Sequence, residues 1–222
     1  MRALILAAGK GERMRPLTLF KPKPLLEVCG IPLIEYHIIN LKKAGFKQIV
    51  VNVSWLAQQI MQRLGNGSQF GVEIRYSYEG EKPLETGGGM LKALPLLNNE
   101  AFLVVNGDIF TDFDFSEISI QDDKLAHLVL VKNPAHNPNG DFALTEDNLL
   151  TNNNSQQKLT YSGIGIYHPK LFKEAQAGKF SVIPLVKQAI AKNLVSGQIH
   201  QQQWDDIGTI ERLTAINNEL IL

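Results

Sequence analysis

The sequence predicts an α/β protein of three layers, in which a mostly parallel, twisted sheet carries helices on both faces. Two observations predict this class. Strand and helix patterns alternate along the first half of the chain, an order typical of parallel sheets with helical crossovers. The first expected strand lies in a continuous apolar run, residues 3–8, which is typical of a strand buried on both faces. We expect one domain over residues 1–222, because no linker or internal repeat divides the chain.

In the first half, each element has a sequence pattern of its own. Apolar residues at 33, 34, 38 and 41 have helical spacing, and Gly45 ends that helix. Thr86 is a candidate N-cap for a later helix, although the three glycines after it weaken the first turn. We therefore expect strands at residues 4–7, 48–53, 72–76 and 101–106, alternating with helices at residues 33–44, 55–64 and 86–97.

The second half of the chain is less regular. A loop rich in Pro, Asn and Gly covers residues 133–140, and the Asn-rich run at residues 152–155 indicates a turn. We expect strands at residues 125–131, 142–144, 149–151, 159–161, 164–167 and 195–200, with helices at residues 181–192 and 209–221. The shorter strands predict a more irregular part of the same sheet.

Composition and charge exclude several classes of protein. The chain has 22 basic and 22 acidic residues, and this balance argues against a nucleic-acid-binding surface. Cys29 is the only cysteine, so no intrachain disulfide can form and a reducing compartment fits. No apolar run approaches the roughly 20 residues of a membrane-spanning helix, and residues 3–8 are too few for a secretory signal. We expect a cytoplasmic protein with neither a nucleic acid nor a membrane as partner.

The loop after the first strand is the strongest candidate for a functional site. Gly9 and Gly11 let a ligand approach the backbone, whose N–H groups can bind phosphate oxygens. Arg13 adds a planar cation, and Lys23 adds a charge on a segment stiffened by prolines on both sides. A P-loop is excluded by spacing, and a dinucleotide fingerprint is excluded because Met14 stands where its third glycine belongs. The loop predicts a polyphosphate site of another kind; the alternative is a basic, glycine-rich surface turn.

Three further segments hold candidate functional residues, each with a structural alternative. Asp108 follows an apolar strand and a tight turn, where it could hold Mg²⁺ or be an ordinary turn aspartate. Asp206 precedes the last helix, where it could hold the same ion or simply favour the helix start. Glycines 87–89 could admit a flat ligand or form a flexible helix start. Ligands of open α/β sheets bind beyond the carboxyl ends of strands, so the first loop and the turn at residues 106–108 should share one crevice.

Residues 8–18 (Ala-Gly-Lys-Gly-Glu-Arg-Met-Arg-Pro-Leu-Thr) and 22–25 (Pro-Lys-Pro-Leu) together resemble the signature of sugar-1-phosphate nucleotidyltransferases. Two departures are mild, because Ala8 replaces a common Gly and Glu12 replaces a common Thr or Ser. The segment Trp204–Thr209 is similar to a second family pattern, Trp-x-Asp-x-Gly-Thr, in which Asp206 is the matching aspartate. The resemblance extends over nearly the whole chain.

The resemblance implies a nucleotide-binding half at residues 1–110 and a sugar-binding half at residues 111–222. It implies catalysis by Arg13 and Lys23, with Mg²⁺ held by Asp108 and Asp206. The residues implied for the nucleotide are Ala7, Ala8, Gly9, Gly11, Arg13, Thr86, Gly87 and Gly88. Those implied for the sugar substrate are Asn106, Gly140, Asp141 and Ser162.

The implied reaction is attack of a sugar 1-phosphate oxygen on the α-phosphorus of a nucleoside triphosphate, with pyrophosphate leaving. UTP and N-acetylmuramate 1-phosphate are the implied substrates, within peptidoglycan recycling. The chain is short beside many dimeric relatives, which is compatible with a monomer but does not fix the oligomeric state. The alternatives are a mannose- or heptose-1-phosphate guanylyltransferase and, in a different class, a non-catalytic subunit that binds nucleotide sugars. The intact set of Arg13, Lys23, Asp108 and Asp206 favours an enzyme over the non-catalytic subunit.

Overall fold

A seven-stranded sheet forms the centre of the protein. A computed structural model describes residues 1–152 and 157–221. The order of strands across the sheet is β12 (Val195–His200), β8 (Ala126–Val131), β11 (Thr160–Tyr167), β6 (Phe102–Asn106), β1 (Arg2–Leu6), β4 (Gln48–Val53) and β5 (Glu73–Tyr78). The last four are parallel neighbours, β12 and β8 are also parallel, and β11 runs antiparallel to the strands beside it. The prediction of a mostly parallel sheet is confirmed.

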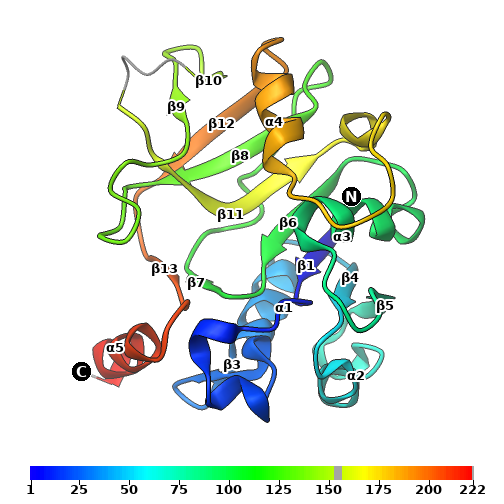
Figure 1. The fold of residues 1–222 in the computed structure, drawn as a ribbon, viewed down its shortest axis with the longest axis vertical. Helices are drawn as coiled ribbons and strands as arrows, with labels where there is room; N and C mark the ends of the chain where they lie inside the picture. The colour runs from blue at the N-terminus through cyan, green and yellow to red at the C-terminus, as the bar shows by residue number, and fades with distance from the viewer. Residues whose placement is uncertain (153–156, 222) are drawn as a thin grey trace.

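Helices cover both faces of this sheet (Figure 1). Two lie on each face: α1 (Leu33–Lys43) and α2 (Ala57–Leu64) on one, α3 (Glu85–Ala93) and α4 (Ile183–Ile190) on the other. Successive strand residues point to opposite faces, so Ile5 packs in the core with α1 and α2 while Leu4 packs in the core with α3 and α4. This is why the apolar run of β1 is continuous, and the predicted three layers are confirmed.

Short strand pairs and a last helix complete the fold. The pairs are β2 (Glu27–Val28) with β3 (Ile31–Pro32), β7 (Ile109–Thr111) with β13 (Trp204–Asp206), and β9 (Ala143–Leu144) with β10 (Leu150–Thr151). α5 (Ile210–Ile221) belongs to a third apolar cluster, in which Ile216 and Ile207 accompany Met14 of the first loop. The β7–β13 pair therefore returns the end of the chain to the turn that follows β6 (Figure 1).

Most predicted elements are confirmed to within a few residues, and the differences have physical reasons. The prediction of Thr86 as N-cap is wrong, because α3 starts at Glu85 after the cap Leu84 and includes glycines 87–89. The strands expected at residues 159–161 and 164–167 are one strand, β11, whose register shifts between Tyr161 and Gly165. The turn expected at residues 152–155 lies mostly outside the described residues.

Short structures were the least predictable from pattern. The β2–β3 and β7–β13 pairs and the 3₁₀ turns at residues 12–14, 17–19 and 23–25 are too short to show a period of their own. Within the two described ranges, the helices all lack the length and apolar character needed to span a bilayer.

Candidate active site

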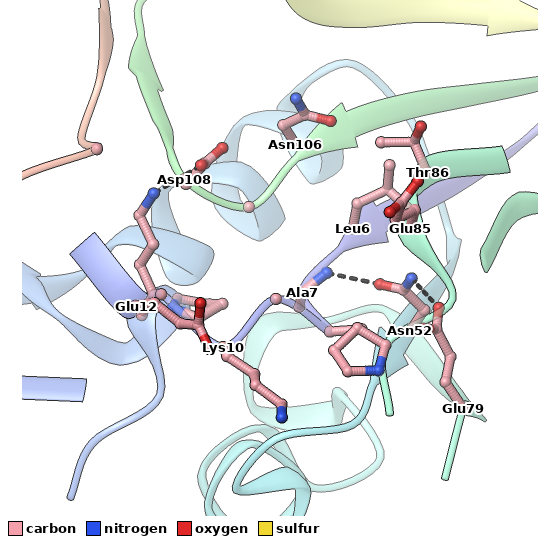
Figure 2. Close-up of a pocket in the computed structure, with 18 of the residues that line it drawn as sticks. Leu6, Ala7, Lys10, Glu12, Asn52, Glu79, Glu85, Thr86, Asn106 and Asp108 are labelled. Carbon is pink, nitrogen blue, oxygen red and sulfur yellow. Dashed lines mark hydrogen bonds and ion pairs between the residues drawn. The ribbon is translucent and has the colours of Figure 1, made fainter. Parts of the chain in front are cut away.

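A cavity of about 730 Å³ opens where β1, β4, β5 and β6 end (Figure 2). The loop after β1 and the turn after β6 both line it, so the predicted shared crevice is confirmed. Nine of the predicted site residues line this cavity: Ala7, Ala8, Gly9, Gly11, Arg13, Lys23, Thr86, Asn106 and Asp108. Most of the lining thus comes from the first half of the chain.

The conformation of the loop after β1 is fixed by hydrogen bonds and close packing at Gly11. Gly11 has a φ of 62°, and a Cβ there would lie 2.9 Å from Thr18 Cγ2 and 3.2 Å from Lys23 Cβ. The Gly11 carbonyl accepts hydrogen bonds from the Met14 N–H at 2.8 Å and the Thr18 hydroxyl at 2.8 Å. Around Gly9, by contrast, a Cβ would meet nothing within 4 Å. The loop is therefore a fixed rim with free space beside Gly9, as an anion site requires.

Lys23 and Asp108 form the main ion pair of the cavity. Lys23 is 8% exposed, and its Nζ lies 2.6 Å from Asp108 Oδ2. Lys23 starts a 3₁₀ turn after Pro22, while Asp108 lies in the turn between β6 and β7. The pair joins segments 85 residues apart in sequence. An ammonium has three N–H donors, so Lys23 can keep this ion pair and still donate to a phosphate oxygen in the cavity.

A buried histidine near Asp108 carries no charge. His37 of α1 is 2% exposed, and burial lowers its pKa to about 4. A hydrogen bond with the backbone of Ile109 connects it to the residue after Asp108. At neutral pH the imidazole is neutral, so the cation that balances Asp108 is Lys23.

Asp206 has a different set of partners. Its Oδ1 accepts a hydrogen bond from Arg212 of α5 and lies 3.0 Å from His136 Nε2. Asp206 does not line the cavity, but its neighbour Gly208 does. The backbone N–H of Ile207 donates to the Asp108 carbonyl at 2.8 Å, so the segments of the two aspartates run side by side.

The two aspartates have the donor chemistry that Mg²⁺ prefers. In residues 1–152 and 157–221, no group of three or more His, Cys, Asp or Glu side chains comes together as a metal site. The contacts described above use Oδ2 of Asp108 and Oδ1 of Asp206, which leaves the second oxygen of each as a hard donor. Mg²⁺ is commonly bound by one or two carboxylates together with waters and phosphate oxygens.

A buried hydrogen-bond chain fixes another part of the cavity wall (Figure 2). The Ala7 N–H donates to Asn52 Oδ1 at 2.6 Å, and Asn52 Nδ2 donates to Glu79 Oε1 at 2.6 Å. The Leu84 N–H then donates to Glu79 Oε2 at 2.7 Å. Burial raises the pKa of Glu79, which is 7% exposed. A Cβ on Gly89 would lie 2.5 Å from Glu79 Oε1, so glycine there makes room for this chain.

Gly87 and Gly88, predicted as nucleotide-binding residues, do not line the cavity. Both are buried, and their N–H groups donate to the Phe180 carbonyl at 2.9 and 3.1 Å. A Cβ on Gly87 would overlap the Phe180 ring, and one on Gly88 would overlap the Gly178 carbonyl. In this structure these glycines accommodate another segment of the chain, and their role toward a nucleotide stays a prediction.

The predicted sugar-binding residues are dispersed. Asn106 lines the cavity. The absence of a side chain at Gly163, which has a φ of 83°, leaves room for the side chain of Asn106. Ser162 is 1% exposed, and its hydroxyl donates to the Val129 carbonyl at 2.8 Å. Asp141 accepts a hydrogen bond from the Tyr161 N–H at 2.8 Å, and its neighbour Gly140 lies against Asn133 and Lys158. Ser162, Asp141 and Gly140 do not line the cavity, so their contact with a sugar also stays a prediction.

Several cavity residues were missed by the sequence analysis. Asn52 and Glu79 lie at the carboxyl ends of β4 and β5, so the rule that pointed to Asp108 would have found them too. Lys10 lines the cavity with its Nζ 5.9 Å from the centre of the Trp55 ring. The other missed side chains include Glu12, Lys82, Glu85 and Lys179. Lys179 has no local sequence pattern, because it reaches the cavity only through tertiary packing.

Comparison with known proteins gives the family. Residues 2–221 match the family model described as "Nucleotidyl transferase". The N-acetylmuramate alpha-1-phosphate uridylyltransferase of Neisseria meningitidis serogroup B is 50% identical over 220 residues, covering 96% of this chain and 95% of that protein. The mannose-1-phosphate guanylyltransferase of Mycobacterium tuberculosis is 35% identical over 116 residues, which are 52% of this chain and 32% of that protein.

Solved structures share the fold. A Bacillus anthracis protein described as a glucose-1-phosphate thymidylyltransferase, in complex with sucrose, has a TM-score of 0.85 at 20% identity and covers 99% of this chain and 95% of its own. HddC from Yersinia pseudotuberculosis, complexed with GMP-PN, has a TM-score of 0.79 at 21% identity and covers 99% of both chains. Since the family model covers nearly the whole chain, this protein belongs to the nucleotidyl transferase family and is an enzyme of the sugar-1-phosphate nucleotidyltransferase class.

Proposed function

We propose that this enzyme transfers UMP from UTP to N-acetylmuramate 1-phosphate, giving UDP-N-acetylmuramate and pyrophosphate. The reaction would be magnesium-dependent, would take place in the cytoplasm and would serve peptidoglycan recycling. The observation that carries the reaction type is the buried Lys23 paired with Asp108 beside the Gly9–Arg13 loop. The support for these substrates is the 50% identity with the Neisseria uridylyltransferase over 96% of the chain.

The chemistry requires two anions to meet. An oxygen of the sugar 1-phosphate attacks the α-phosphorus of UTP, and the bond to the pyrophosphate breaks. Because the nucleophile is already an anion, no strong general base is required, and catalysis depends on positioning and on charge neutralisation. Lys23, fixed by Pro22 and by its ion pair, is suited to offset the repulsion between the two phosphates.

The remaining roles follow from where each group lies. The Gly9–Gly11 backbone and the exposed Arg13 guanidinium would bind the departing pyrophosphate. Asp108 and Asp206 would hold Mg²⁺, which when bound supplies further charge neutralisation at the phosphates. Thr86 and Asn106 line the cavity across from the phosphate loop, where the base and the sugar would lie (Figure 2).

Steady-state kinetics with four substrate pairs tests this proposal. UTP and GTP are each combined with N-acetylmuramate 1-phosphate and with mannose 1-phosphate, in the presence of Mg²⁺, and pyrophosphate release is measured. We expect a preference for UTP and N-acetylmuramate 1-phosphate, because a site built to hydrogen-bond one base leaves polar groups unpaired with another. Preference for GTP with mannose 1-phosphate would contradict the proposed substrates and leave the enzyme class intact. No turnover of any pair would favour a non-catalytic binding protein.

A further inference from the structure

We propose that Lys179 is the residue that recognises the carboxylate of the acceptor sugar. Gly87 and Gly88 of α3 allow the segment that carries Lys179 to pack where the lysine reaches the cavity. The inference rests on the proposed function, because N-acetylmuramate 1-phosphate differs from N-acetylglucosamine 1-phosphate by a lactyl ether that ends in a carboxylate. A substrate with this extra anion requires a cation or N–H donors in the cavity that are not already used by the phosphates.

Lys179 comes from a different part of the chain than most of the residues that line the cavity. Among the described residues, the cavity is lined by segments between Leu6 and Asp108, by Lys179 and by Gly208. Gly208 has no side chain. Of the described residues in the range 111–222, Lys179 is therefore the one that places a side chain in the cavity, and this is the half of the chain expected to bind the sugar.

The segment that directly follows Lys179 is held against the start of α3 by hydrogen bonds. The Phe180 carbonyl accepts from the N–H groups of Gly87 and Gly88, and the Phe180 N–H donates to the Leu84 carbonyl at 3.1 Å. The Val182 N–H donates to Thr86 Oγ1 at 3.0 Å. Three backbone hydrogen bonds and one to the Thr86 hydroxyl thus fix the segment from which the lysine side chain extends.

The glycines make this close packing possible. A side chain on Gly87 would overlap the Phe180 ring, and one on Gly88 would overlap the carbonyl of Gly178, which directly precedes Lys179. A helix whose first turns contain three consecutive glycines is costly, by about 1 kcal/mol for each glycine relative to alanine. The packing of the segment at residues 178–182 gives a structural reason for this composition and connects it to Lys179.

Lys179 is also a cavity cation that is available to bind an acceptor carboxylate. Lys23 is buried against Asp108, and Arg13 belongs to the phosphate loop. Lys179 has a side chain that is 65% exposed, and its Nζ is 3.4 Å from Glu85 Oε1. An exposed pair of this kind contributes little and is readily exchanged for another carboxylate. Glu85, which pairs with Lys179, and Thr86 lie across the cavity from Asp108 (Figure 2).

The test compares two acceptors that differ only in the lactyl group. Lys179→Gln should lower kcat/KM for N-acetylmuramate 1-phosphate about tenfold, as expected for one charge-assisted hydrogen bond, and leave kcat/KM for N-acetylglucosamine 1-phosphate unchanged. The KM for UTP should also stay unchanged. Lys179→Arg should restore most of the discrimination. If the second acceptor is not turned over, its inhibition constant replaces kcat/KM in the comparison.

Two further variants complete the test, one as a matched control and one as a probe of the packing against α3. Lys173→Gln removes an exposed lysine that precedes the same segment and does not line the cavity, so it should change neither acceptor. Gly88→Ala should displace the Lys179 segment and reduce the discrimination even though Lys179 is intact. An equal loss for both acceptors in Lys179→Gln, or no loss for either, would overturn the role of Lys179. Failure of the unaltered enzyme to use N-acetylmuramate 1-phosphate would instead refute the proposed function.

Discussion

Two glycine-bearing segments lie in or beside the cavity, and their glycines have different surroundings. In the loop after β1, a Cβ on Gly9 would meet nothing within 4 Å, so the glycine leaves space that faces the cavity. In α3, Gly87 and Gly88 are buried, and any side chain there would overlap the segment at residues 178–180. The first segment makes room for a ligand, and the second makes room for the protein itself.

The difference teaches how to interpret a glycine motif. Both segments suggest close backbone approach from sequence alone, because glycine has no Cβ. Only the three-dimensional neighbours show whether the approaching group is a substrate or another part of the chain. The distinction predicts which measurement a substitution should change in each region. A substitution in the phosphate loop should change the kinetics. A substitution in α3 should change the stability or the placement of the neighbouring segment.

Lys23→Ala should have the largest effect of the substitutions considered. Loss of this cation should lower kcat/KM by about 10²–10³-fold, or roughly 3–4 kcal/mol, as for other preorganised charges that face a transition state. Pyrophosphate release under steady-state conditions measures the effect. Lys21→Ala is the matched control, because Lys21 lies two residues away, pairs with exposed Glu27 and does not line the cavity. Near-normal turnover in Lys23→Ala would remove Lys23 from the mechanism.

The second prediction concerns the two aspartates. Asp108→Asn and Asp206→Asn should each reduce activity and raise the Mg²⁺ concentration needed for half-maximal rate. The double variant should lose much less than the sum of the two single losses, since both residues would act through one ion. Asp205→Asn is the control, because Asp205 is the adjacent carboxylate and does not match the family pattern. Additive losses with an unchanged Mg²⁺ titration would separate the two aspartates into independent sites.

Alanine at Gly88 and at Gly9 tests the comparison most directly. By helix propensity alone, Gly88→Ala would stabilise α3 by about 1 kcal/mol. The overlap with the Gly178 carbonyl opposes this, because overpacking typically costs about 1–3 kcal/mol and a backbone group cannot rotate away. We expect net destabilisation in urea unfolding.

Gly9→Ala should behave in the opposite way. Since a Cβ there meets nothing within 4 Å, the free energy of unfolding should stay within about 0.5 kcal/mol of the original value. The KM for the nucleoside triphosphate should rise, because the new methyl group occupies space beside the phosphate loop. Equal destabilisation by Gly9→Ala and Gly88→Ala would mean that the two segments do not differ in the way described here.

Much of this fold follows from patterns in the sequence, and the site follows only in part. The apolar run of β1, the helical spacing of α1 and the motif around Lys23 are local, so they are readable without a structure. The strand-end rule placed Asp108 beside the phosphate loop because it depends on sheet topology alone. Lys179 and the burial of Ser162 depend on which segments pack together, and no local pattern records that.

Glu79→Gln should have the smallest effect, and it probes the connection between the two glycine segments. The chain from the Ala7 N–H through Asn52 to Glu79 and the Leu84 N–H joins the phosphate loop to the start of α3. Both Glu79 oxygens accept hydrogen bonds, so the amide of glutamine leaves one buried N–H facing another donor. An unsatisfied buried donor costs about 1–3 kcal/mol, and we expect a value near 1 kcal/mol because the substitution also removes a buried carboxylate.

The pH dependence of stability checks the same residue. Burial raises the folded-state pKa of Glu79 above its ordinary value of 4.5, so the stability that its protonated form contributes is lost as pH rises through the folded-state pKa. Glu79→Gln has no such group, and its difference from the original protein in urea unfolding should therefore shrink as the pH rises from 4.5 toward 8. A constant difference across this range would show that Glu79 does not titrate there. A rise in the KM for the nucleotide at constant pH would show that the chain of hydrogen bonds through Asn52 also supports the phosphate loop.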